Sequence, residues 1–252
     1  MSLPSATPPH PIAAPPPLRP KPVGGVATAA MALLGAAGIT GLIGALAQLR
    51  YRSAVGDVYA EAGDNSELAL SRLVDADSDL YEIAYVLSLV VGLATVVVFL
   101  MWFRRLRANA EFLAPGGHRR APGRAVSAWF FPVSNLWEPK QITDDVIKAL
   151  GPAPPRLRGV VNAWWASWVG YLTLSVVTSV YASVGPDESD FTTYEVTEVA
   201  GRLDVKGFTD ALRTFAACDI VVSLLSVVAA GLAIRAVHEL SRAQDTRLGF
   251  GH

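Results

Sequence analysis

The stretch IAYVLSLVVGLATVVVFLMWF, residues 83–103, decides the fold, because it carries no charged residue over its whole length. A helix needs about 20 predominantly apolar residues to cross about 30 Å of hydrocarbon. Buried helices of soluble proteins are rarely apolar on every side over such a length. The stretch therefore predicts a transmembrane helix.

Three more runs share this character: residues 22–49, 159–186 and 214–234, of which only the last contains a charge, Asp219. The whole chain is 52% hydrophobic and 17% charged, whereas about 25% of the residues of a typical soluble domain are charged. We therefore expect an all-α membrane protein with four transmembrane helices in two hairpins. The expected spans are 24–49, 82–106, 159–184 and 211–237.

The lysines and arginines set the expected orientation. Residues 104–158 contain ten of them, whereas the loops at 49–80 and 183–210 contain seven acidic residues each. Because cytoplasmic loops are enriched in Lys and Arg, we expect a multi-pass protein of the cell membrane with both termini and the central segment 104–158 in the cytoplasm. The expected parts are a disordered proline-rich tail at 1–22, the membrane domain at 23–240 and a second tail at 241–252.

The N-terminal region leaves two questions open. Ala45-Leu46-Ala47 has the small-x-small form of a signal-peptide cleavage site. The hydrophobic part of a signal peptide spans about 7–15 residues, which is shorter than this run, so we expect an uncleaved anchor. In the tail, PPPLRP at 15–20 is typical of a ligand for a proline-recognising domain, and a flexible tail is the alternative.

The segment AWFFPVSNLWEPKQITDDVIKAL, residues 128–150, is too short and too polar to span, and too apolar for an ordinary loop. Pro132 and Pro139 interrupt any continuous helix, and Pro139 suits the first turn of a helix that reaches about Leu150. The apolar face is expected to carry Ile142, Val146, Ile147 and Leu150, with Lys140, Asp144, Asp145 and Lys148 elsewhere. The segment predicts a re-entrant or interfacial elbow, followed by an amphipathic helix on the inner leaflet.

The segments WFRRLRANAEFL at 102–113 and AWFFPVSNLWEP at 128–139 resemble an uncharacterised actinobacterial membrane family, the domain of unknown function 4328, over roughly residues 80–240. In that family a span ends in Trp-Phe, followed by an arginine and an asparagine, and then by a Trp-Phe-x-Pro-x-x-Asn-Leu-x-x-Pro box. The chain lacks the tryptophan that the family commonly has near Ala125 or Ser127, and the histidine that it has near Arg104. The resemblance implies the four-span architecture and no chemistry. The candidate binding residues are Trp102, Phe103, Arg107, Asn109, Trp129, Phe130, Pro132, Asn135, Trp137 and Pro139, and Leu136 completes the box.

Two roles are open for this aromatic box. If it binds a partner, the side chains of Trp129, Asn135, Trp137 and Arg107 are expected to be exposed. If it is structural, Asn135 is expected to cap the following helix, or to bond Arg107 or Asn109 inside the bundle. We favour the structural role for Asn135.

Two further candidates lie inside the spans. An ionisable group in a membrane helix, here Asp219, is a functional candidate by default. The alternative is a position near the outer end, within reach of water or Arg213. Small residues such as Ala37 and Gly41 permit close helix packing or self-association, and Cys218 is expected to be a packing residue.

The sequence contains no residue pattern of the kind that catalysis needs. The four histidines form no metal-spaced pair, and no Gly-rich phosphate loop occurs. We therefore expect no enzyme, no metal or cofactor and no nucleic-acid partner. We expect an interaction or scaffold protein with an inner-leaflet docking surface, which contacts the lipid bilayer, anionic inner-leaflet lipids and a membrane-protein partner or a second copy. The alternative is a transporter or channel subunit that acts as an oligomer.

Overall fold

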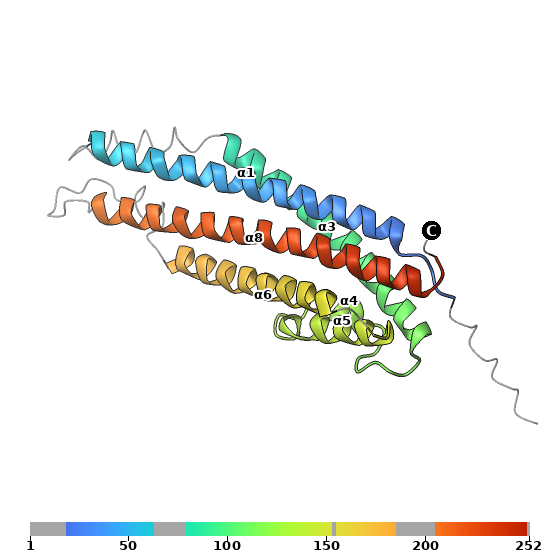
Figure 1. The fold of residues 1–252 in the computed structure, drawn as a ribbon. Helices are drawn as coiled ribbons and strands as arrows, with labels where there is room; N and C mark the ends of the chain where they lie inside the picture. The colour runs from blue at the N-terminus through green and yellow to red at the C-terminus, as the bar shows by residue number, and fades with distance from the viewer. Residues whose placement is uncertain (1–18, 63–78, 153–154, 185–204, 251–252) are drawn as a thin grey trace, which may run out of the picture.

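A computed structural model describes residues 19–62, 79–152, 155–184 and 205–250 (Figure 1). Its four long helices are α1 (Gly24–Ala62), α3 (Asp79–Leu113), α6 (Pro155–Val184) and α8 (Val205–Arg247). Between α3 and α6 lie α4 (Arg124–Ser127), the 3-10 turn η1 (Ser134–Leu136) and α5 (Glu138–Ala149). The described ranges contain no strand. The expected proline-rich tail, up to residue 18, and the central parts of both acidic loops lie outside the described residues.

Each long helix contains a stretch that is long and apolar enough to cross a membrane. The four candidate spans are Gly24–Ser53, Tyr85–Leu113, Pro155–Tyr181 and Arg213–Arg247. The prediction of an all-α protein with four long apolar helices is therefore confirmed. The helices also run beyond the expected spans, as α1 does to Ala62, because no proline or glycine pair interrupts the polar sequence that follows the apolar run.

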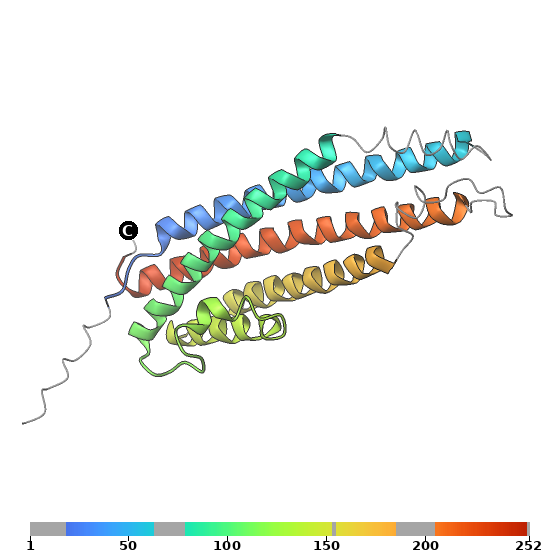
Figure 2. The ribbon, with the colours of Figure 1, turned by 180° about the vertical axis from the view of Figure 1, so that it is seen from behind.

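The two central helices come from opposite halves of the chain. α1 packs along most of α8, while α3 packs against α1 and crosses α8, and α6 packs against α8. Figures 1 and 2 show the resulting order, with α1 and α8 side by side and α6 next to α8. The sequential pairs α1–α3 and α6–α8 do touch, but the α1–α8 contact is the most extensive one and joins them.

A glycine on α1 allows this close approach. A Cβ atom on Gly41 would lie 2.8 Å from Ser226 Oγ and 3.4 Å from Val227 Cγ2 of α8. The next small residue along this face, Gly38, faces Ala230, whereas Gly35 faces open space. The small residues of the first span therefore pack against α8 of the same chain, which is the usual way in which apolar helices gain contact where lipid supplies no hydrophobic drive.

The core lies at one end of the bundle, which we call the basic end because it carries the arginines of residues 104–124 and 156–158. Fully buried side chains of this core include Trp102, Phe103, Leu106, Val161 and Leu240. Elsewhere the long helices leave large apolar side chains uncovered. Water would solvate such a surface poorly, whereas hydrocarbon solvates it well. The surface is that of a membrane-spanning protein.

Candidate functional site

The elbow, residues 128–138, begins with an aromatic side chain that joins α3 to α6. The Trp129 ring centroid lies 5.3 Å from that of Phe99 and 5.6 Å from that of Phe103, both on α3. On the other side it lies 6.1 Å from the Trp165 ring and 6.2 Å from the Trp168 ring of α6. Such tilted and edge-on pairs each contribute about 0.5–1.5 kcal/mol beyond their buried area. The elbow is thus built into the core of the basic end.

Ion pairs close the elbow on itself. Glu138, at the start of α5, is buried, and its carboxylate accepts a hydrogen bond of 2.8 Å from Arg124 Nε of α4. Arg120 Nη1 lies 3.4 Å from the other carboxylate oxygen. Two arginines from the preceding loop and helix therefore hold the first turn of α5, which leaves the intervening residues as a closed loop.

A second ion pair fixes the loop before α4. The Asp145 side chain is 2% exposed, and its oxygens accept hydrogen bonds from the backbone N–H of Arg119 and from Arg119 Nε, both at 2.9 Å. Arg119 Nη2 also donates to the Gln141 carbonyl at 3.0 Å. A buried carboxylate without such partners would be costly, so Asp145 and Arg119 depend on each other.

Arg107 ties the same loop to α3. Its Nη1 donates to Glu111 at 2.8 Å, and its Nη2 donates to the backbone carbonyl of Arg120 at 3.0 Å. Glu111 in turn accepts a hydrogen bond from the Gly116 N–H at 2.9 Å, where a positive φ of 72° favours glycine. His118 lies beside this group with a side chain only 2% exposed, and neither ring nitrogen makes a hydrogen bond.

Asn109, two residues after Arg107, bonds the segment that leads into α1 instead of the elbow. Its side chain exchanges two hydrogen bonds with the backbone of Lys21, and its Nδ2 also donates to Gln244 Oε1 at 3.1 Å. The neighbouring Asp245 accepts the N–H groups of Val23 and Gly24, both at 3.1 Å. The carboxylate of α8 therefore caps the N-terminus of α1, where negative charge is favourable.

The outer surface of the elbow is apolar and uncovered. Phe130 is 65% exposed, Phe131 55% and Val133 67%. Leu136 and Trp137 are exposed as well. Arg124 lies over the Phe131 ring at 5.5 Å, so the same arginine that pairs with Glu138 also steadies an exposed aromatic side chain.

The structure separates the residues expected from the sequence into three groups by their exposure. The buried group comprises Trp102, Phe103, Arg107, Asn109 and Pro139. The exposed group comprises Phe130, Pro132, Leu136 and Trp137, and the half-buried group between them comprises Trp129 and Asn135. Of the four side chains that a binding box was expected to expose, only Trp137 is exposed.

The hypothesis that Asn135 caps the next helix is wrong. The N-cap residue of α5 is Trp137, and no side chain caps it. The hydrogen bonds of Arg107 and Asn109 go to other partners, and Asn135 Oδ1 is buried without a partner. The Asn135 backbone N–H donates to the Phe131 carbonyl at 2.8 Å, as any residue other than proline could.

Sequence reasoning missed four polar residues that organise this end: Glu138, Asp145, Gln244 and Asp245. Gln244 is fully buried and bonds the Leu106 carbonyl at 2.9 Å through Nε2. The periodicity of α5 placed Asp145 off the apolar face, and no local pattern marks the other three. Their partners lie 14 to 222 residues away in sequence, which is why no local signal identifies them.

Asp219 lies far from this group, inside α8. Gln48 of α1 donates from Nε2 to its Oδ2 at 3.0 Å. The partner of Asp219 is therefore a side chain of the neighbouring helix α1. Within the described residues, no group of three His, Cys, Asp or Glu side chains could hold a metal ion.

The family model described as "Domain of unknown function (DUF4328)" matches residues 65–242. This range includes the elbow, the aromatic cluster and the ion pairs of Glu138 and Asp145. It leaves out Lys21 and Gln244, which are the partners of Asn109. No curated protein and no solved structure matches the chain.

Proposed function

Because the chain belongs to the DUF4328 family, whose description names no activity, we propose from its own residues that it is a non-enzymatic interaction protein of the membrane. The elbow is its contact surface. The observation that carries this proposal is a contrast within one short segment: buried ion pairs and aromatic packing hold the elbow from inside, while its largest apolar side chains point outward.

The depth of the elbow supports a re-entrant position. Trp129 packs on Phe99, which lies five residues, or about 7.5 Å of helix rise, before the first arginine of α3. In both views of the ribbon, α5 and the elbow run alongside α6 and do not lie across its end (Figures 1 and 2). This depth supports a position of the elbow at the level of the apolar runs, where its exposed side chains would meet hydrocarbon.

The backbone of the elbow suits this environment. Irregular backbone at membrane depth is tolerated only where its polar groups are satisfied. Successive turns in the elbow pair its own groups: the Trp129 N–H donates to Val126 O at 3.2 Å, and that of Leu136 to Val133 O at 3.3 Å. The Ser134 hydroxyl adds a bond to Ala128 O at 3.4 Å. The segment can thus present apolar side chains without exposing many peptide groups to lipid.

The partner that fits this surface is the apolar face of another membrane protein's helix. Phe130, Phe131 and Val133 are exposed on a segment that is held in place from inside. Aromatic side chains such as those of Phe130 and Phe131 are enriched in protein–protein interfaces. At the same end Arg104, Arg158 and Arg242 are exposed, and they are suited to anionic inner-leaflet lipids. This arrangement also agrees with cytoplasmic termini.

The test is site-specific photo-crosslinking in native membranes, with the crosslinker at Phe130 or Trp137. A crosslinker at Val90, which is 60% exposed on α3 away from the elbow, is the matched control for ordinary lipid contact. We expect a discrete protein adduct from both elbow positions and lipid adducts alone from Val90. The adduct from Trp137 should disappear in Val133→Ser. Lipid adducts alone from all three positions would refute the proposal.

A second candidate, transport by an oligomer, has one observation in its favour: the polar pair of Gln48 and Asp219 inside the membrane helices. Flux of protons or cations into proteoliposomes that hold the purified protein distinguishes it. A flux that Asp219→Asn abolishes would favour transport. Equal flux from protein-containing and empty liposomes would remove this candidate.

A further inference from the structure

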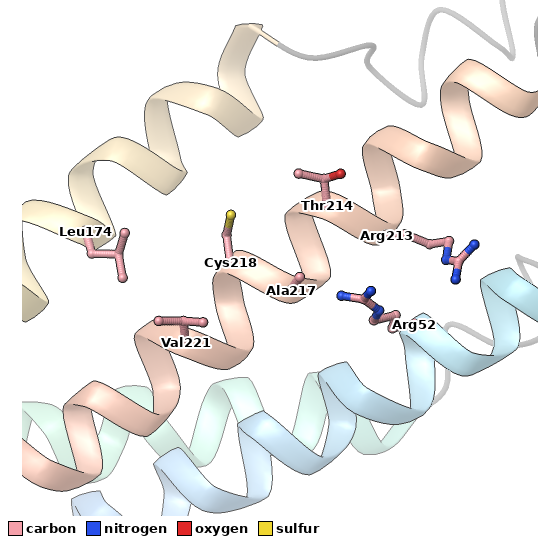
Figure 3. Close-up of a pocket in the computed structure, with 7 residues that line it drawn as sticks. All are labelled: Arg52, Leu174, Arg213, Thr214, Ala217, Cys218 and Val221. Carbon is pink, nitrogen blue, oxygen red and sulfur yellow. The ribbon is translucent and has the colours of Figure 1, made fainter.

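A cavity at the opposite end of the bundle carries the further inference. It is lined by residues of α1, α6 and α8 in the part of these helices that is farther from the basic end, and it has a volume of about 480 Å³. This size falls within the range of about 300–1,000 Å³ that is typical of sites for small molecules. The lining residues are Arg52, Leu174, Arg213, Thr214, Ala217, Cys218 and Val221 (Figure 3).

Two arginines from different helices stand at its mouth. In Figure 3 the side chain of Arg52 reaches from α1 toward α8, and that of Arg213 extends from α8 toward α1. Within the described part of the chain, neither guanidinium forms an ion pair. The nearby carboxylate, Asp219, instead accepts its hydrogen bond from Gln48. Two guanidinium groups that line one cavity and have no ion pair among the described residues attract an anion, and the guanidinium fork matches phosphate geometry.

The wall becomes apolar with increasing depth. Arg213 begins the apolar run of α8, and Cys218 and Val221 follow five and eight residues later, at about 7.5 and 12 Å of helix rise. Leu174 of α6 closes the opposite side. The cavity thus has a cationic mouth at the level of the membrane surface and an apolar interior at the level of acyl chains.

We propose that this cavity binds a phosphate-bearing amphiphile, namely an anionic phospholipid of the leaflet at this end. Its phosphate binds at the mouth, which Arg52 and Arg213 line, and one acyl chain runs past Cys218 toward Val221. A free phosphate would gain nothing from the apolar wall, and a neutral lipid would leave both guanidinium groups without an anion. This site is independent of the elbow and of the function proposed for it.

The chain carries its own reporter for the test. Cys218 is the one cysteine of the sequence and lines the cavity, so its alkylation by a maleimide reports occupancy. The purified full-length protein in a delipidating detergent is labelled alone, with short-chain phosphatidylglycerol, with short-chain phosphatidylcholine, or with inorganic phosphate. With phosphatidylglycerol at ten times its Kd, about one tenth of the sites stay open, so labelling should slow about tenfold.

The controls test the cationic mouth and the apolar interior of the cavity separately. Arg213 is exposed, so Arg213→Gln is expected to fold normally, and it should lose most of the protection. Arg247→Gln, which changes an exposed arginine at the other end of α8, should keep it. Phosphatidylcholine and inorganic phosphate should protect only weakly, and native mass spectrometry should show one retained phosphatidylglycerol that Arg213→Gln loses. Equal labelling with and without phosphatidylglycerol would overturn the proposal, as would equal protection by inorganic phosphate.

Discussion

The side chain of Asn109 bonds both polar backbone groups of Lys21. The Lys21 N–H donates to Asn109 Oδ1 at 3.0 Å, and Asn109 Nδ2 donates to the Lys21 carbonyl at 2.7 Å. This amide thus bonds an extended chain as a neighbouring strand would. Asn109, which matches the asparagine of the family motif, therefore anchors the segment that leads into α1. Arg107, and not Asn109, bonds the loop that precedes the elbow.

Removing this anchor should loosen the start of α1. Asn109→Ala deletes both bonds to Lys21 and leaves the fully buried Gln244 without one partner. A lost buried partner costs about 1–3 kcal/mol, so we expect the free energy of unfolding to fall by that amount. Hydrogen exchange at residues 21–27 should become faster, and mass spectrometry of the peptic peptides measures it.

Lys21→Ala is the matched control, because only the backbone of Lys21 takes part in the two bonds. It should leave both exchange and stability unchanged. If Lys21→Ala accelerates exchange as much as Asn109→Ala does, the anchor works through the side chain of the lysine and the interpretation is wrong.

Glu138 should be the charge on which the elbow depends most. Glu138→Gln keeps the shape but removes the charge that Arg120 and Arg124 share. Breaking a fully buried pair costs about 3–5 kcal/mol. Because both arginines are about one third exposed, we expect about 1–2 kcal/mol here. Limited proteolysis should then cut within residues 128–138.

Asp144→Asn provides the comparison on the same helix. Asp144 is 37% exposed and pairs with Lys140 one turn away. Exposed pairs of this spacing contribute about 0.3–0.5 kcal/mol, so proteolysis should remain at the wild-type rate. Equal sensitivity of both variants would show that general loss of charge, and not the Glu138 pair, governs the elbow.

The contrast between Glu138 and Asp145 shows what the sequence could predict. The four long apolar helices were predictable because span length and composition are local properties. The breaks at Pro132 and Pro139 were predictable for the same reason. Asp145 was expected on a polar face, yet it is buried, because Arg119 from a distant loop reaches it. Pairing across the fold overrides the helical period, and no local pattern records it.

The arrangement of the helices was harder to predict from the sequence. Both halves of the chain read as hairpins, but the main contact joins α1 to α8. Their fit depends on Gly41 meeting Ser226 and Val227. A small-residue pattern predicts that a helix packs closely, but not against which helix. The choice between self-association and internal packing therefore needed the structure.

Filling the α1–α8 contact should separate these two helices. Gly41→Ala places a methyl group within 2.8 Å of Ser226 Oγ, and overpacking of this kind costs about 1–3 kcal/mol. Gly35→Ala is the control, since nothing lies within 4 Å of its Cβ position. Unfolding in detergent should show a loss for Gly41→Ala and none for Gly35→Ala. Adding Ser226→Ala to Gly41→Ala should recover most of the lost stability. Failure of that rescue would contradict the proposed contact between Gly41 and Ser226.

The Gln48–Asp219 pair allows a test that separates a structural acid from a functional one. Asp219→Asn keeps an oxygen that can accept from Gln48 Nε2, so we expect the free energy of unfolding to fall by less than about 1 kcal/mol. Asp219→Leu leaves the buried Gln48 amide without its partner and should cost about 1–3 kcal/mol.

The double variant Gln48→Leu/Asp219→Leu removes both polar groups together. It should recover part of the loss seen in Asp219→Leu, since replacing both partners by apolar groups is often nearly neutral. If Asp219→Asn proves as damaging as Asp219→Leu, the negative charge itself is required. Asp219 would then be more than a hydrogen-bond acceptor between two helices, and the transport alternative would gain its first measured support.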